Sequence, residues 1–155
     1  TLIVIILIVY KAYRKHKRFI QEKNASLYQL EQKNTLHLTR IQTMYAEIEN
    51  RCNILVQSPN LKQELCWKEY GQMCRIADQQ FYLFASKLQK EGLKEREIRL
   101  CLLVLLNLSH ARIADMMFVE ENSVGKLKER TAKRLSTSRK NMREKLLKIT
   151  IGDES

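Results

Sequence analysis

The side chains best suited to chemistry lie between residues 121 and 135, a stretch rich in lysine and arginine. Projected as an α-helix, at about 100° per residue, this stretch separates its apolar and polar side chains onto opposite faces. The apolar stripe holds Val124, Leu127, Thr131 and Leu135. The opposite face holds Asn122, Lys126, Glu129, Arg130 and Lys133. Cationic donors suit guanine edges and phosphates, and an amide suits adenine, so this face predicts contact with a major groove of DNA.

The net charge of +11 is concentrated in two islands. Residues 1–18 hold five basic side chains and no acid, and residues 126–148 hold ten basic against two acidic side chains, whereas both signs balance in between. Because the first island follows an apolar run, membrane headgroups are its expected partner, and nucleic acid is the expected partner of the second. Any surface helix shows charge opposite its core stripe. The positive surplus around the helix is therefore what favours DNA.

Three short helices with tight connections are predicted to position the polar face. Residues 95–106 form a largely apolar helix, after which Asn107 can adopt the left-handed conformation that turns the chain. Ser109 then caps a helix over residues 110–117. Its inward-facing side chains are expected to be Ile113, Ala114 and Met117. With a third helix over about 122–135, this succession predicts a helix-turn-helix in an all-α chain.

A gapless pattern of residues runs through this stretch. Its members are Leu93, Arg96, Glu97, Leu100, Leu103, Ser109, Ile113, Ala114, Val119, Ser123, Val124, Arg134 and Leu135. The pattern resembles the LuxR-type helix-turn-helix, and the resemblance covers residues 93–148. It departs from the usual residues at Lys94, Asn107, Arg112, Glu120, Gly125 and Leu127. The resemblance implies a four-helix DNA-binding domain over residues 93–150. It carries DNA contacts over to Lys126, Arg130, Lys133 and Arg134.

The chain opens with ten uncharged residues, TLIVIILIVY, followed at once by a basic block. A spanning helix needs about 20 apolar residues, so these ten cannot cross a bilayer alone. We expect residues 1–13 to be the C-terminal part of a transmembrane helix that begins before Thr1, with the remainder cytoplasmic because positive charge follows the apolar run. The alternative is a core helix of a soluble protein.

Residues 14–58 are predicted to form a basic juxtamembrane segment and a long connector helix that ends before Pro59. A seven-residue spacing typical of a coiled-coil seam links Ile20, Leu27, Asn34, Ile41, Ile48 and Leu55. The companion positions are weaker: Lys23, Leu30, His37, Met44 and Arg51. Two interpretations stay open. One is a parallel homodimer with Asn34 in its seam, and the other is a single helix that packs back on its own domain.

Residues 60–91 are predicted to form one or two linker helices, with Asn60 near their start and Gly92 as a stop. Their candidate core residues are Leu61, Leu65, Trp67, Met73, Ile76, Phe81, Phe84 and Leu88. The stretch 67–88 is similar to the segment before the helix-turn-helix in bacterial regulators that carry periplasmic tetratricopeptide repeats before a membrane span. This resemblance implies a single-pass protein of the bacterial inner membrane.

Enzymatic, metal-binding and cofactor-binding motifs are missing from the sequence. There is no GxxxxGK[ST] loop, no paired histidine ligands and no CxxC pair, so neither an enzyme, a metal nor a cofactor is expected. Cys66 and Cys74 are eight residues apart and could share a helix face as apolar packing residues. Two functions remain: a membrane-anchored, DNA-binding transcriptional regulator, and a membrane-tethered protein-interaction module with a degenerate helix-turn-helix. Apolar residues on the exposed face would favour the second.

Overall fold

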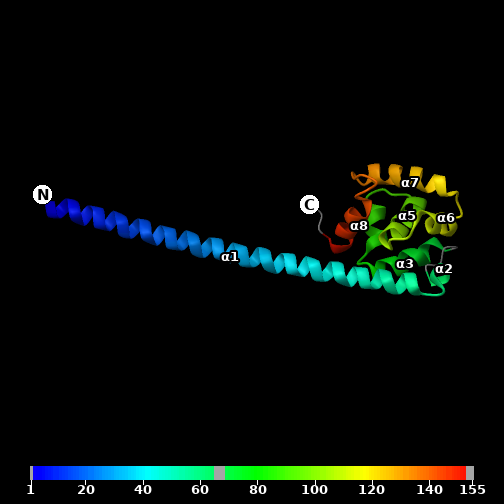
Figure 1. Ribbon diagram of the computed structural model, residues 1–155, viewed down its shortest axis with the longest axis horizontal. Coiled ribbons are helices and arrows are strands. Elements are labelled where there is room, and N and C mark those ends of the chain that lie inside the picture. Colours follow the sequence, from blue (N-terminus) through cyan, green and yellow to red (C-terminus); the bar gives the residue numbers. More distant parts are fainter. Residues whose placement is uncertain (1, 65–68, 153–155) are drawn as a thin grey trace. The chain divides into compact units, whose positions relative to one another are not determined.

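The computed structural model describes residues 2–64 and 69–152 (Figure 1). It is 82% helical and holds no strand in these ranges, which confirms the all-α prediction. The helices are α1 (Leu2–Gln57), α2 (Leu61–Glu64), α3 (Tyr70–Gln80), α4 (Phe84–Lys90), α5 (Glu95–Leu105), α6 (His110–Met117), α7 (Glu121–Arg134) and α8 (Met142–Ile151). Leu65, Cys66 and Trp67, which the sequence offered as packing residues, lie outside the described ranges.

The chain divides into two units, residues 1–42 and residues 43–155. The first unit consists, where described, of α1 up to Gln42, and its side chains are exposed apart from a half-buried Ile41. The apolar residues 2–9 are all exposed. No helix within the described residues has a stretch long and apolar enough to span a membrane.

The last turns of α1 belong to the second unit and enter its core. Ile48, Cys52 and Leu55 are buried there, at the spacing by which residues share one helix face. Two of the six residues in the seven-residue spacing therefore pack within this unit. The helix ends at Gln57, two residues before Pro59, as the sequence predicted.

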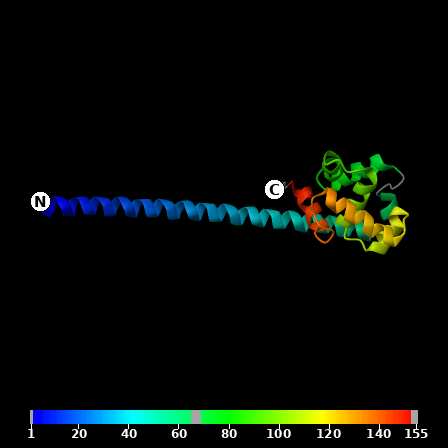
Figure 2. The same cartoon turned by 90° about the horizontal axis from the view of Figure 1, so that it is seen from above.

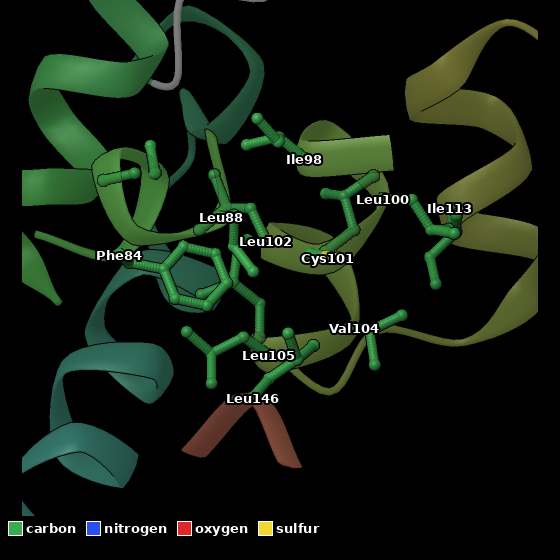
Figure 3. Packing of buried hydrophobic residues seen from close by; sticks show 14 of the residues in the cluster. Phe84, Leu88, Ile98, Leu100, Cys101, Leu102, Val104, Leu105, Ile113 and Leu146 are labelled. Carbon is green, nitrogen blue, oxygen red and sulfur yellow. The ribbon is translucent and has the colours of Figure 1, made fainter. Parts of the chain in front are cut away.

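Helix α5 forms the centre of the second unit. All side chains from Leu100 to Leu106 are buried, because α5 packs against α4, α6, α7 and α8. Phe84 and Leu88 of α4 lie against Leu102 and Leu105 of α5, with Leu146 of α8 beside them (Figure 3). The linker helices and the four-helix segment thus share one hydrophobic core. The predicted boundary between residues 91 and 93 does not divide this core.

The described parts of the expected linker of one or two helices hold three, α2, α3 and α4, and the break between α3 and α4 had no signal in the sequence. Tyr82 and Leu83 are both left-handed, with φ of 55° and 63°, a conformation that costs large side chains free energy. Asp78 holds this turn: its carbonyl accepts from Leu83 N at 3.0 Å, and its carboxylate accepts from Ser86 N at 3.0 Å and from Ser86 Oγ. Gly92, with φ of 77°, ends the region after α4 as predicted.

Candidate nucleic-acid interface

The connection between α5 and α6 has the turn chemistry that the sequence indicated. Asn107 is left-handed, with φ of 58°, and Leu108 N donates to Leu103 O at 3.3 Å, which closes the end of α5. Ser109 caps α6, and its Oγ accepts from Arg112 N at 3.3 Å. Both predictions are confirmed, so α6 begins where the capping residue predicted.

The turn between α6 and α7 depends on a second left-handed residue. Phe118 has φ of 54°, and Val119 N donates to Ala114 O at 3.0 Å, after which α7 begins at Glu121. Glu120 precedes α7 but gives it no side-chain cap. The two helices lie side by side in both views (Figure 1, Figure 2), as a helix-turn-helix requires.

The inward face of α6 includes a methionine that the sequence did not single out, while Met117 packs against the core as predicted. Ile113 and Ala114 are buried as expected, but Met116 is the buried methionine and Met117 is only half-buried. Residues three or four positions apart lie on the same helix face. Met116, three residues after Ile113, is therefore on the face that enters the core. Met117 is the last residue of α6, just before the chain turns at Phe118.

The two faces of α7 are arranged as the projection predicted. Its buried residues include the whole apolar stripe, Val124, Leu127, Thr131 and Leu135. The Thr131 hydroxyl donates to Leu127 O at 2.8 Å, which satisfies it inside the core. The predicted polar face is exposed throughout: Asn122, Lys126, Glu129, Arg130 and Lys133. In Figure 1, α7 runs along one edge of its unit, with α5 and α6 next to it.

The cations of this face differ in their partners. Lys133 pairs with Glu129 at 3.2 Å, one helical turn away, and both side chains are largely exposed, so this pair contributes little to stability. Within the described residues Lys126 and Arg130 form no ion pair. Together with Ser123 and Leu127 they line a hollow of about 230 Å³, whose other wall is Arg96 of α5.

Arg134, which the resemblance offered as a DNA contact, has a partner within its own fold. Its guanidinium lies 3.2 Å from the Glu97 carboxylate, and Glu97 is only 4% exposed. The same carboxylate oxygen accepts from Lys94 N at 2.9 Å at the start of α5. Glu97 therefore supplies the bond that a Glu at this position gives in a capping box, and Arg134 joins the end of α7 to the start of α5. The sequence alone gave no sign of this pairing because the two residues are 37 positions apart.

Three further polar residues lie beside α7 that the sequence did not single out. Lys128 Nζ is 3.2 Å from His110 Nε2 at the start of α6. One guanidinium nitrogen of Arg139, from the connection between α7 and α8, lies 3.7 Å from where a Cβ on Gly125 would be. Burial, and next the charge of Arg139, lower the pKa of Lys128. The surplus of positive charge after residue 126 was the one signal that could have found them.

The cysteines that the structure describes are packing residues. Cys52 and Cys101 are buried and Cys74 is half-buried, and none of the three is in a disulfide. Burial raises the pKa of the Cys52 thiol to about 11 and raises that of Cys101 further, so both thiols stay protonated and unreactive. In the described part of the chain no group of His, Cys, Asp and Glu side chains could hold a metal ion.

No protein-family model matches this sequence, and neither the curated proteins nor the solved structures contain a match.

Proposed function

We propose that this chain is the inner part of a membrane-anchored transcriptional regulator that binds double-stranded DNA through α7. The observation that carries the proposal is the exposed polar face of α7, with Lys126 and Arg130 free of protein partners in the described residues. This helix follows a short helix and a tight turn, which is the order in which a recognition helix enters a major groove. The resemblance to the LuxR type adds to the same proposal.

The second candidate is a membrane-tethered module that binds another protein. Phe118, at the turn before α7, is 82% exposed, and its ring lies under the Lys62 ammonium at 5.5 Å. A single exposed aromatic is normal for a protein surface. The predicted reading face itself carries no apolar side chain, which favours DNA.

The proposal is tested by selecting bound duplexes from a random DNA pool across a salt series. The whole chain is kept in mild detergent, because residues 2–9 are apolar and exposed. We expect the selection to converge on one sequence, with an affinity that falls linearly in log salt. If no duplex is retained even at low salt, DNA binding is refuted.

Replacing Arg130 with alanine should weaken binding to the selected site by about 1–3 kcal/mol and relax preference at one base pair. The side chain is exposed and unpaired in the described residues, so the fold should not change. The matched change Lys133→Ala should weaken all sequences alike and reduce the salt slope by about one, as expected of a phosphate contact. Equilibrium titrations of each variant with the selected duplex and with random duplexes, across a salt series, measure the affinity and its salt slope. Equal losses on both duplexes for Arg130→Ala would contradict base reading.

We further propose that α1 connects this domain to the bacterial inner membrane and pairs with a second copy. Residues 2–9 are exposed and apolar, and the basic residues that follow them support a cytoplasmic position for the remainder. Ile20 and Leu27 of the seven-residue spacing are exposed, whereas Ile48 and Leu55 are buried. Self-association would therefore involve only the part of the helix before the domain.

Replacing Asn34 with leucine should strengthen self-association, or change its stoichiometry, if Asn34 lies in a seam between two copies. Sedimentation of the chain from Phe19 to Ser155 measures this directly. Gln32→Leu is the matched control, because it adds the same side chain outside both seam positions of the repeat. If Asn34→Leu and Gln32→Leu sediment alike, the seam is not a dimer interface.

A further inference from the structure

The face of α7 is bordered on both sides by cations that come from other elements. At about 100° per residue, Ser123 and Arg130 lie on one flank of the face, and Gly125 lies on the other. Arg96 of α5 reaches the first flank and Arg139 reaches the second. A pair of basic residues therefore brackets the helix.

The first flank is a hollow rather than a flat surface. It measures about 230 Å³ and is lined by Arg96, Ser123, Lys126 and Arg130, with Leu127 completing the wall. A water molecule takes about 30 Å³ in the liquid, so the hollow has room for a phosphate group together with some of its hydration. Beside Arg130, which we assign to a base edge, two cations and one hydroxyl line it, and no acidic side chain does.

On the second flank the cation comes from the connection between α7 and α8. One guanidinium nitrogen of Arg139 lies 3.7 Å from where a Cβ on Gly125 would be, which is an ordinary contact distance. Lys128, one turn further along α7, contacts His110 at 3.2 Å. Glu129 lines the neighbouring hollow with Arg139, but its carboxylate is paired with Lys133. The positive charges of Lys128 and Arg139 repel each other, and a bound anion would relieve this repulsion.

Two other arginines of this unit have acidic partners on distant segments. Arg134 pairs with Glu97, and Arg143 with Glu49. By contrast, neither Arg96 nor Arg139 forms an ion pair with any residue that the structure describes. Their charge is available to an outside anion on the same side of the unit as the reading face.

We propose that Arg96 and Arg139 form a phosphate clamp. Each arginine contacts one of the two DNA backbones that border one major groove. This inference rests on the proposed function, since the occupant is the DNA that α7 reads. A helix inside a major groove has one phosphate backbone on each side, and contacts to those backbones set its register without reading sequence. Lys126 strengthens the clamp on the Arg96 side.

The test uses the whole chain in detergent, with two duplex probes: the sequence selected from the random pool and a random-sequence duplex. Arg96→Gln and Arg139→Gln remove one charge each from exposed positions. Each should weaken both duplexes by the same factor and reduce the slope of log affinity against log salt by about one. The double variant should reduce this slope by about two, because the two arginines contact different strands. Arg96→Lys and Arg139→Lys keep the charge and should restore the slope.

Arg75→Gln is the control, an exposed arginine on α3 outside both flanks, and it should leave the slope unchanged. If Arg96→Gln or Arg139→Gln leaves the slope unchanged while the parent chain binds its selected duplex, the clamp is refuted and DNA binding by α7 stands. A change in sequence preference would also refute the clamp, because phosphate contacts do not select bases. If the parent chain binds neither duplex, the proposed function falls together with the clamp.

Discussion

Replacing Phe84 with alanine is expected to lower the free energy of unfolding by about 3–5 kcal/mol. The ring is 0% exposed and lies edge-on to Phe81, with 6.4 Å between ring centroids. It also packs against Leu102 and Leu105 of α5, so the cavity would lie where the linker helices meet the helix-turn-helix (Figure 3). Urea unfolding followed by circular dichroism measures the loss.

The matched control is Leu83→Ala, one residue earlier. Leu83 is 60% exposed, and alanine keeps the same Cβ at this left-handed position, so the backbone cost does not change. We expect a change within about 0.5 kcal/mol. If Phe84→Ala behaved like this control, α4 would not belong to the core that supports α7.

Local signals predicted much of the fold, because the residues that end and begin helices act over a few positions. Asn107 turns the chain, Ser109 caps α6, and Gly92 ends the linker region, each at the predicted place. The buried stripe of α7 followed from periodicity alone. These are contacts within one or two helical turns, which a sequence pattern can reveal.

The parts that sequence reasoning missed depend on contacts between distant segments or on unfavourable backbone conformations. Arg134 meets Glu97 across 37 positions. Tyr82 and Leu83 turn left-handed although their side chains disfavour it, so no turn signal marked the break between α3 and α4. Of the two choices left open for the connector helix, its final turns pack on their own domain.

The candidate site was predicted only as far as α7 itself. Periodicity places side chains on one helix, so it identified the exposed face from Asn122 to Lys133. Arg96 and Arg139 reach that face from α5 and from the connection before α8, and tertiary packing alone brings them there. The pattern of one helix cannot contain that information.

Replacing Ile48 with alanine is the change most informative about the connector. Ile48 is 0% exposed, on the last turns of α1, and we expect the free energy of unfolding to fall by about 2–5 kcal/mol. Polar contacts hold the same turns: Glu49 pairs with Arg143 at 2.6 Å, and the Arg143 Nε also donates to Leu105 O at 3.2 Å. A fragment that begins after Pro59 would lose Ile48 and the Glu49–Arg143 ion pair, and it should be less stable than one that begins at Thr43.

Ile54→Ala supplies the control on the same helix. Ile54 is 61% exposed, so the same loss of side-chain volume should change the free energy of unfolding by no more than about 0.5 kcal/mol. Urea unfolding of the chain from Thr43 to Ser155 compares the two without the exposed part of α1. A large effect for Ile48 alone means that the buried face of α1 is part of the core that supports α7. Equal, small effects for both variants would show that α1 only tethers the domain.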